Sequence, residues 1–330
     1  MKYIITGGAG FIGSHLCDYL LELKSTQKII IIDNLKDGSK KNLKLSLKNK
    51  KVKLYKKDIK NKEKIFNLFK NIDVVFHLAA QSDIVPSIEN PVEYYQSNVN
   101  GTLNILETMR DQNVKKIIFA ASSSCYGIPK FIPTKEIDQI DLRYPYAFSK
   151  NMAEQMIVHW SRVYNINYIS LRLFNVYGPR SRTNSAYGAA LGIFMKQKLS
   201  NSPYTVVGDG KQKRDFIHVR DVSKAFYKAG VSKQKNKIFN VGSGKPVTVN
   251  YLLRLIGDQQ KVYVPKRPGE PNVTHADIKK IKKFLKWKPE ISIEKGIKNV
   301  LENINYWKSA PLWDKNKIRI ATKNWFKYLS

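Results

Sequence analysis

The first half of the chain alternates short apolar runs with longer stretches in which apolar residues recur every three or four positions. The short runs are rich in β-branched residues and predict strands at Tyr3–Thr6, Lys28–Ile32, Val52–Tyr55, Val74–Leu78, Lys116–Ala121 and Tyr168–Arg172. The longer stretches predict amphipathic helices at Ser14–Lys24, Lys62–Phe69, Pro91–Asp111 and Tyr146–Tyr164. Continuous apolar strands that alternate with helices predict an α/β fold with a doubly wound parallel sheet, buried on both faces.

A glycine-rich turn joins the first predicted strand to the first helix. Its sequence, Thr6–Gly13, has glycines at positions 7, 10 and 13, the spacing of a dinucleotide-binding turn in a Rossmann-type sheet. Such a turn holds a pyrophosphate at the helix N-terminus, where unpaired N–H groups favour an anion. Asp33 ends the second strand 20 residues after Gly13, and its carboxylate can accept hydrogen bonds from the adenosine ribose and repel a 2′-phosphate. The sequence therefore predicts NAD as the cofactor.

Two further segments follow predicted strands at the same edge of the sheet. Asp58-Ile59 comes after the third strand, where it can bracket the adenine. Leu78-Ala79-Ala80 comes after the fourth strand and has the small side chains needed where a strand end meets a cofactor. For both segments, a loop without a ligand is the alternative interpretation.

A serine run, a tyrosine and a lysine are the candidate catalytic groups. Tyr146 and Lys150 are four residues apart in a predicted helix and so share one face. A tyrosine with a pKa of about 10 is a poor base at neutral pH, but a nearby ammonium and a positive nicotinamide favour its phenolate. Ser122, Ser123 and Ser124 follow the fifth strand, and a hydroxyl there can relay a proton to Tyr146. The alternatives are an ion-pairing surface helix and a polar loop.

Composition restricts the partners. Lys and Arg total 58 against 26 Asp and Glu, a formal net charge of +32 that favours anionic partners. Lysine-rich runs such as Lys48–Lys51 contain no aromatic residues on which bases could stack, so we expect no nucleic acid. No run approaches the roughly 18 apolar residues of a membrane span. No secretion signal is recognisable, and Cys17 and Cys125 cannot form a disulfide framework or a four-cysteine metal site, so we expect a cytoplasmic protein without a metal.

These residues form part of an ordered series of motifs over nearly the whole chain. Its other members are Asp33-Asn34-Leu35, His77–Ala80, Asn98–Thr102, Ala121–Gly127, Leu171–Arg180, Arg214–Val219, Phe239–Gly244, Arg267–Glu270 and Ala276-Asp277. The series resembles the extended short-chain dehydrogenase/reductase family, and most closely its UDP-glucose/UDP-N-acetylglucosamine 4-epimerase type. The resemblance implies an NAD-dependent enzyme that inverts C4 of a UDP-hexose through transient oxidation to the 4-keto sugar.

The motifs and the resemblance together assign individual residues. The resemblance makes Tyr146 the base that removes the proton of the sugar 4-hydroxyl, directly or through Ser122, and makes Lys150 the partner of Tyr146 on the nicotinamide ribose. The expected cofactor residues are Gly7, Gly10, Phe11, Ile12, Gly13, Asp33, Asn34, Asp58, Ile59, Leu78, Ala79, Ala80, Asn98, Tyr146, Lys150 and Phe174. The expected substrate residues are Ser122, Ser123, Tyr146, Asn175, Arg214, Arg267 and Thr274. Asn175 and the two arginines should hold the nucleotide diphosphate, which suits the rigid donor fork of an arginine.

Two positions bear on the choice of substrate. Similar dehydratases and decarboxylases carry an acidic residue just after the catalytic hydroxyl, whereas this chain has Ser123 and Ser124, which favours epimerisation. Thr274 stands where a bulky tyrosine restricts similar enzymes to plain hexoses, so its small side chain resembles the type that admits an N-acetyl group. The UDP-GlcNAc/UDP-GalNAc and UDP-glucose/UDP-galactose pairs both stay open. So do UDP-glucuronate 4-epimerisation, 4,6-dehydration or decarboxylation and, more distantly, a non-enzymatic NAD-sensing protein.

The pattern changes after about Tyr177, where glycine, proline and serine become frequent and the strands shorten. We expect residues 1–176 to form the NAD-binding Rossmann domain, with 213–240 returning to it, and residues 177–330 to form mainly a smaller α/β substrate-binding lobe. The resemblance implies a homodimer formed through the predicted helices at 91–111 and 146–164. The tail from Tyr306 carries Trp307, Trp313 and Trp325, and we expect a segment so aromatic to pack against the protein.

Overall fold

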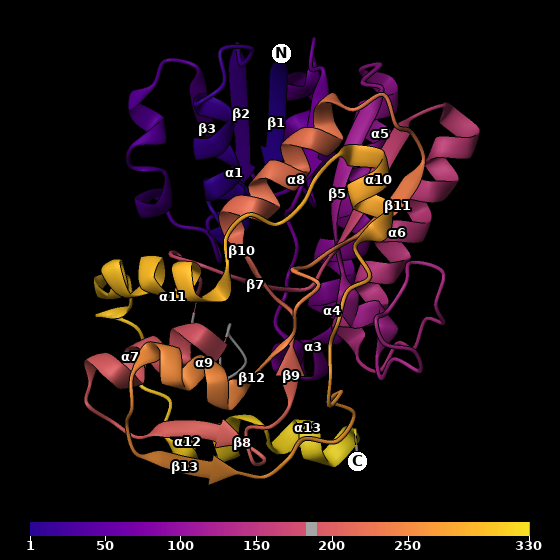
Figure 1. Cartoon of the computed structure of the whole chain (residues 1–330). Helices are drawn as coiled ribbons and strands as arrows, with labels where there is room; N and C mark the ends of the chain where they lie inside the picture. Colours follow the sequence, from indigo (N-terminus) through magenta and orange to yellow (C-terminus); the bar gives the residue numbers. More distant parts are fainter. Residues whose placement is uncertain (183–189, 330) are drawn as a thin grey trace.

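A seven-stranded sheet lies at the centre of the larger part of the molecule, in a computed structural model that describes residues 1–182 and 190–329 (Figure 1). All of its strand pairs are parallel, in the order β11-β6-β5-β4-β1-β2-β3. The strands are β1 (Lys2–Thr6), β2 (Lys28–Asp33), β3 (Val52–Lys56), β4 (Val74–His77), β5 (Lys116–Ser122), β6 (Asn167–Leu173) and β11 (Lys237–Val241). The predicted strands and the Rossmann-type sheet are thus confirmed, and the order reverses between β1 and β4, where such sheets bind ligands.

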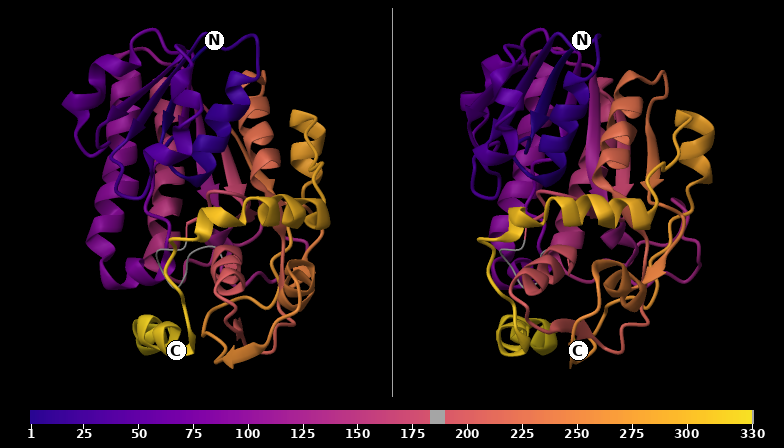
Figure 2. Two further views of the ribbon diagram at one scale, coloured as in Figure 1. Left: turned by 90° about the vertical axis from the view of Figure 1, so that its left-hand side faces the viewer. Right: turned by 60° about the vertical axis from the view of Figure 1, so that its left-hand side comes forward.

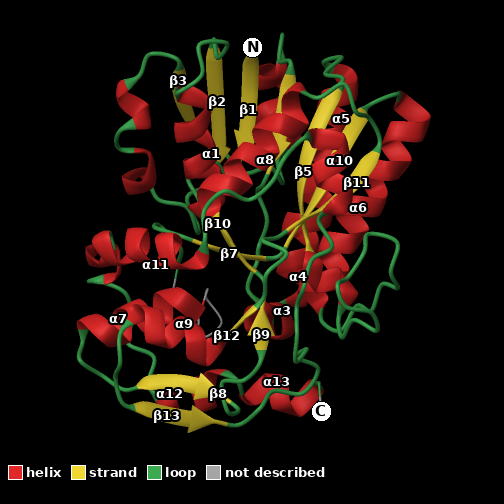
Figure 3. Cartoon of the chain, in the orientation of Figure 1, coloured by secondary structure: helices red, strands yellow, loops and turns green. Residues whose placement is uncertain are grey.

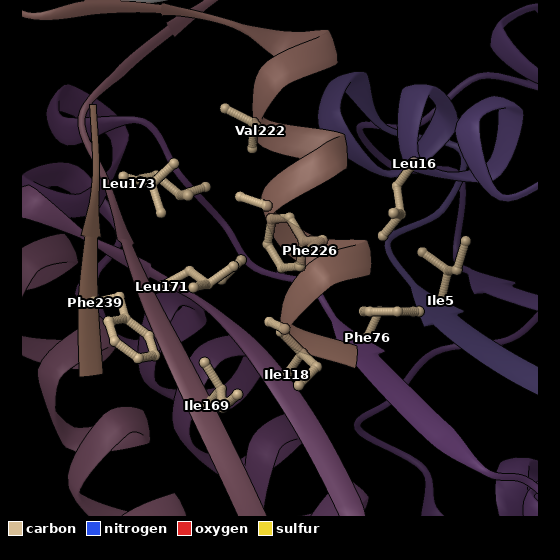
Figure 4. Packing of buried hydrophobic residues seen from close by; sticks show 14 of the residues in the cluster. Ile5, Leu16, Phe76, Ile118, Ile169, Leu171, Leu173, Val222, Phe226 and Phe239 are labelled. Atoms are coloured by element: carbon tan, nitrogen blue, oxygen red, sulfur yellow. The ribbon is translucent and has the colours of Figure 1, made fainter. Parts of the chain in front are cut away.

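Helices cover both faces of this sheet (Figure 3). One face carries α1 (Phe11–Leu21), α8 (Val219–Val231) and α10 (Lys279–Leu285), and the other carries α2 (Lys62–Phe66), α5 (Gly101–Asp111) and α6 (Pro145–Tyr164). Figure 4 shows Phe226 of α8 packed over the sheet beside Phe76 and Leu171. Both the helix α8 and the strand β11 come from the second half of the chain, so the sheet is completed by residues distant in sequence.

The predicted helices are present, with two instructive differences. Helix α1 begins at Phe11 rather than Ser14, because the extended Gly10 is its N-cap and the glycine turn leads directly into the helix. The predicted helix at 91–111 is composite: α4 (Pro91–Tyr94) continues into a π-helical stretch (Tyr95–Asn100) and then into α5. A π-helical turn contains an extra residue, so it changes the direction of the side chains around it.

A smaller lobe lies beyond the carboxyl ends of the sheet strands, as Figure 2 shows in two views. Its strands pair two by two: β7 (Asn175–Tyr177) with β10 (Phe216–His218), β8 (Tyr204–Val207) with β13 (Lys261–Val264), and β9 (Lys213–Arg214) with β12 (Val247–Thr248). The remaining helices are α3 (Ile84–Glu89), α7 (Ala190–Leu199), α9 (Val249–Ile256), α11 (Ile293–Glu302), α12 (Lys315–Ala321) and α13 (Lys323–Tyr328). Single 3-10 turns lie at Lys40–Leu43, Ser46–Lys48, Asn67–Phe69, Ser123–Tyr126 and Ile304–Trp307.

The aromatic tail packs as expected. Trp307 and Trp325 are each 1 % exposed. The Trp307 indole donates a hydrogen bond to the Ser181 carbonyl (2.9 Å), and the Trp325 indole donates one to the Pro268 carbonyl (2.8 Å). The tail is therefore fixed to two loops at the lobe junction. In the described part of the chain, no helix is both long enough and apolar enough to cross a membrane.

Candidate active site

One cavity of about 420 Å³ lies at the carboxyl edge of the sheet. Most of the residues proposed from sequence line it: Gly7, Gly10, Phe11, Ile12, Gly13, Asp33, Asn34, Asp58, Ile59, Leu78, Ala79, Ala80, Ser122, Tyr146, Lys150, Phe174 and Asn175. They come from the carboxyl ends of β1 to β6, from the start of β7 and from helices α1 and α6. The fold thus brings the dinucleotide turn and the Ser–Tyr–Lys group into one space.

The glycine turn is shaped by close backbone contacts. Gly7 has a positive φ of 69°, and a Cβ there would lie 2.8 Å from the Ala79 backbone. A Cβ on Gly10 would meet only the Gly7 carbonyl at 3.1 Å, so its bare Cα leaves room on the cavity side. The first-turn N–H groups of α1 have no acceptor within the helix. The turn therefore offers a close approach and unpaired donors to an anion such as a pyrophosphate.

Asp33 ends β2 beside this turn. Its carboxylate accepts hydrogen bonds from the backbone N–H groups of Ala9 (2.9 Å) and Leu35 (2.8 Å), which fixes its orientation. Burial raises the pKa of Asp33, and these two N–H groups oppose that shift. A carboxylate has about four acceptor sites, so two remain for ribose hydroxyls. The residues present therefore fit NAD. Among residues 1–182 and 190–329, no cluster of three His, Cys, Asp or Glu could hold a metal ion.

Ser122, Tyr146 and Lys150 meet at the other end of the cavity. Ser122 is the last residue of β5, and it lines the cavity together with Tyr146. Pro145 begins α6 and Tyr146 follows it, so Lys150 lies one turn further along the same face. Lys150 is 5 % exposed, and its ammonium nitrogen lies 4.2 Å from the centre of the Phe119 ring. The three side chains singled out from the sequence thus line the same cavity.

Burial is the largest influence on the pKa values of Tyr146 and Lys150. Burial raises the pKa of Tyr146, the hydrogen bond from Ser122 opposes that shift, and the charge of Asp83 adds to it. Burial lowers the pKa of Lys150 to about 7, against a smaller upward effect of Glu154. Burial disfavours the charged form of both groups. Burial thus favours the neutral phenol at Tyr146 and makes Lys150 easier to deprotonate than an exposed lysine.

Five proposed residues do not line this cavity: Asn98, Ser123, Arg214, Arg267 and Thr274. Asn98 is buried behind the wall. Its amide donates to the Gln81 carbonyl (3.0 Å) and to the Ser149 hydroxyl (3.0 Å), and its oxygen accepts from the Gln81 N–H (2.8 Å). Since Gln81 lines the cavity, Asn98 positions the wall rather than facing the space itself.

One of the two arginines, Arg214, lines a second cavity in the smaller lobe, and Arg267 lies next to the lining residue Lys266 in sequence. Arg214 and Glu270 line a cavity of about 400 Å³. One Glu270 oxygen lies 2.8 Å from Arg214, and the other lies 4.0 Å from Arg267. Thr274 donates to the Asn175 amide oxygen (3.0 Å) and accepts from the N–H of Asp215 (3.1 Å). Asn175 faces the first cavity and Asp215 follows Arg214, so this contact joins the two regions.

Sequence reasoning missed several lining residues. Gln81, Ser82 and Asp83 directly follow the predicted Leu78–Ala80 segment, so their place after a strand was an available signal. Arg182 also lines the cavity and forms ion pairs with Asp37 and Asp83, which lie in different loops. No local pattern marks Arg182, because its partners are distant in sequence. Asp37, Lys57, Ser97 and Ser181 are further polar lining residues that sequence reasoning missed.

Comparisons with known proteins agree with this geometry. Residues 3–242 match the model of the NAD dependent epimerase/dehydratase family. A protein of Methanocaldococcus jannaschii, provisionally named a UDP-glucose 4-epimerase, is 41 % identical over 90 % of this chain and 96 % of its own length. A UDP-glucuronate 4-epimerase of Thermodesulfobacterium geofontis is 36 % identical over 93 % and 98 %. The solved structure of a UDP-N-acetylglucosamine 4-epimerase from Methanobrevibacter ruminantium, 32 % identical, superposes with a TM-score of 0.86 over 93 % and 98 %.

Proposed function

Because the chain belongs to the NAD-dependent epimerase/dehydratase family, we propose that it epimerises C4 of a UDP-hexose, with Tyr146 as the base. The observation that carries this proposal is that Ser122, Tyr146 and Lys150 line the same cavity as the glycine turn and Asp33. Its relatives are UDP-sugar 4-epimerases. The family also includes dehydratases, so the reaction must be argued from the side chains.

NAD is the cofactor of this family. The turn at Gly7–Gly13 would hold its pyrophosphate, Asp33 its adenosine ribose, and Lys150 its nicotinamide ribose. Bound NAD would supply the acceptor, and afterwards the donor, of a hydride at C4. Asp33 favours NAD over NADP because a fixed carboxylate repels a 2′-phosphate.

Residues of the chain itself remove and return the proton of the sugar 4-hydroxyl. Tyr146 removes it, directly or through Ser122, and returns it after the sugar has presented its other face. Positions 123 and 124, where dehydration or decarboxylation would need an acid, are serines. No carboxylate is therefore supplied there for the loss of water or CO2. This supports epimerisation over the two alternatives.

Substrate anchoring must leave the sugar free to turn. We assign Asn175, Arg214 and Arg267 to the diphosphate, and the second cavity to the nucleoside. The diphosphate would compete with Glu270, which engages both arginines in this structure. Remote contacts of this kind hold the substrate without fixing the reacting ring. The small Thr274, beside Asn175, supports an N-acetylhexose, so UDP-GlcNAc/UDP-GalNAc is the favoured pair and UDP-glucose/UDP-galactose the second.

Proton NMR of the protein as purified tests this proposal. It is incubated without added NAD with UDP-GlcNAc, UDP-glucose and UDP-glucuronate in turn, and we expect the 4-epimer to appear fastest from UDP-GlcNAc. Tyr146→Phe should lower the rate by about 10²–10⁴-fold, the usual contribution of a general base, while the amount of NAD released on denaturation stays that of the wild type. Loss of water or CO2, or a Tyr146→Phe variant with full activity, would contradict the mechanism.

Three broader assignments complete the proposal. Residues 1–176, with 213–240, form the NAD-binding domain, and 177–330 form mainly the substrate lobe. The protein acts in the reducing cytoplasm, which both buried, unpaired cysteines Cys17 and Cys125 suit. It acts as a homodimer joined through the helical segments 91–111 and 146–164, which carry exposed apolar side chains such as Val92 and Phe148.

A further inference from the structure

Arg182 pairs with two carboxylates that belong to different loops around the first cavity. Its Nη1 atom pairs with Asp37, and its Nη2 atom lies 3.4 Å from a carboxylate oxygen of Asp83. Asp37 lies in the loop after β2, and Asp83 lies in the loop after β4, where it is the N-cap residue of α3. All three residues line the cavity that contains the glycine turn. We call this group the Asp37–Arg182–Asp83 bridge.

The bridge spans the glycine turn that follows β1. In the sheet, β1 lies between β4 and β2, so the loops that follow these two strands flank the turn. On the β2 side, the N–H of Ser39 donates to the carbonyl of Ala9 in the turn (3.0 Å). On the β4 side, a Cβ at Gly7 would come within 2.8 Å of the Ala79 backbone. A side chain that pairs with both loops therefore connects them across the turn that offers its N–H groups to a pyrophosphate.

The segment that leads to Arg182 is fixed on the helix that begins at this turn. The His15 ring of α1 donates to the Pro179 carbonyl (2.9 Å). Arg180 pairs with Asp18, one turn further along α1, at 2.7 Å. Because its backbone is already held in place, Arg182 loses less conformational freedom on forming its two pairs than an arginine on a mobile loop would. The bridge is therefore preorganised over the turn.

The charges of the bridge suit an anion only while the arginine is present. Without Arg182, the two carboxylates would repel each other and a diphosphate beside them. A guanidinium has five N–H donors, and the two pairs engage one terminal nitrogen each, so the arginine can also donate to a diphosphate while it stays paired. The side chains of Arg182 and Asp83 are only 23 % and 20 % exposed, so solvent screens their pair in part.

We propose that Arg182 is a cofactor-retaining residue: the Asp37–Arg182–Asp83 bridge closes over the glycine turn, so that bound NAD leaves only after the bridge has opened. The proposal deepens the proposed function, on which it rests for the place of the NAD pyrophosphate at the turn. It also fits that function, because a C4 epimerase needs the same cofactor molecule for both halves of its reaction. Slow exchange of the cofactor therefore costs such an enzyme nothing.

The rate of NAD release tests the bridge without any activity. The protein is loaded with radiolabelled NAD and chased with an excess of unlabelled NAD, with no sugar present, and the label that stays with the protein is followed over time. Arg182→Met should release NAD about tenfold faster, the effect of losing two partly exposed ion pairs. Arg220→Met is the matched control, since it removes the same charge from an exposed pair with Glu22 (2.8 Å), away from the cavity. Its release rate should equal that of the wild type.

Asp37→Asn separates the bridge from simple attraction between Arg182 and the diphosphate. If the arginine acted only by attraction, removing a nearby negative charge would slow the release of NAD. The bridge predicts the opposite, a release about threefold faster, because one of its two pairs is lost. In the double variant, release should be no faster than in Arg182→Met alone, since the bridge is already open there.

Three results would overturn the bridge: unchanged release in Arg182→Met, slower release in Asp37→Asn, or effects that multiply in the double variant. Equal acceleration in Arg220→Met would also overturn it, because the effect would then follow from net charge alone. All of these rates are measured without a sugar. Absence of epimerisation would therefore contradict the proposed function and leave the result on NAD release standing.

Discussion

At the scale of single residues, Lys150 shows how a side chain of the candidate site affects the stability of the fold. The lysine is buried against Phe119, and burial lowers its pKa to about 7. An unfolded lysine has a pKa of about 10.4. Between these values the unfolded chain binds more protons than the folded one, so the stability related to this group rises with pH. Below about pH 7 the full penalty of a buried cation is present.

Lys150→Met should therefore stabilise the protein in acid while abolishing turnover. At pH 6 we expect the free energy of unfolding to rise by on the order of 2 kcal/mol, with the gain vanishing toward pH 10. Urea unfolding at pH 6, 8 and 10 measures this, with the exposed Lys70→Met as the control that should show no pH-dependent gain. A variant less stable than the wild type at pH 6 would mean that the ammonium stabilises the fold.

Residue-level prediction from sequence succeeded where function requires a side chain at a fixed distance along one element. Tyr146 and Lys150 are an example, since helical spacing alone places them on one face. It was incomplete where a residue acts through partners distant in sequence. Arg182 is held by Asp37 and Asp83, and no local pattern encodes such contacts.

At the scale of elements, a buried ion pair fastens α6, which carries the candidate base, to β6. Glu154 of α6 pairs with Arg172 of β6 at 2.6 Å and also accepts from the Ser170 hydroxyl at 2.6 Å. Arg172 further donates to the Tyr126 hydroxyl (2.9 Å) and to the Glu136 carbonyl (3.1 Å). Both side chains of the pair are almost fully buried. Such a pair adds little net stability, but losing one partner leaves an uncompensated charge.

Arg172→Met should thus destabilise the protein by about 3–5 kcal/mol, because Glu154 stays buried without its partner. Adding Glu154→Gln should recover part of that loss, since the remaining amide carries no charge. Urea denaturation of the wild type, both single variants and the double variant measures the coupling energy. If the two single losses simply add, Glu154 and Arg172 do not depend on each other, and the α6–β6 connection must be attributed to apolar packing.

The secondary-structure elements also show what the periodicity of apolar residues cannot predict. The apolar pattern predicted a helix over 91–111 but not the π-helical turn inside it. A three-to-four residue repeat tolerates one extra residue, so the pattern carries no mark of the turn. The turn matters for the candidate site, because it places Ser97 in the cavity lining and Asn98 behind the lining residues. The sheet strands were predictable because burial on both faces favours continuous apolar runs, such as Ile29–Ile32 of β2.

At the scale of the whole molecule, the net charge disfavours dimerisation, whereas the exposed apolar surface favours it. The proposed dimer face carries Val92 and Phe148, exposed by 65 % and 43 %, and Phe148 meets Tyr95 edge-on at 6.1 Å. Two copies of a chain with a net charge of +32 repel each other. Salt screens that repulsion, with a Debye length of about 30 Å at 0.01 M and about 8 Å at 0.15 M, but leaves apolar contacts intact. Association should therefore strengthen as salt is added, opposite to a dimer held by ion pairs.

Sedimentation equilibrium at about 0.01 M and 0.15 M ionic strength, the two limits of that screening, tests this directly. The dimer dissociation constant should fall by about tenfold or more between them, which corresponds to about 1.4 kcal/mol. Phe148→Lys should remain monomeric at both, because it adds a charge to the apolar contact. Ile137→Lys is the matched control: Ile137 is 87 % exposed, lies outside the proposed face and should leave the dissociation constant unchanged. A monomeric wild type at both salt concentrations, or equal weakening by the two lysine variants, would place the contact elsewhere or remove it.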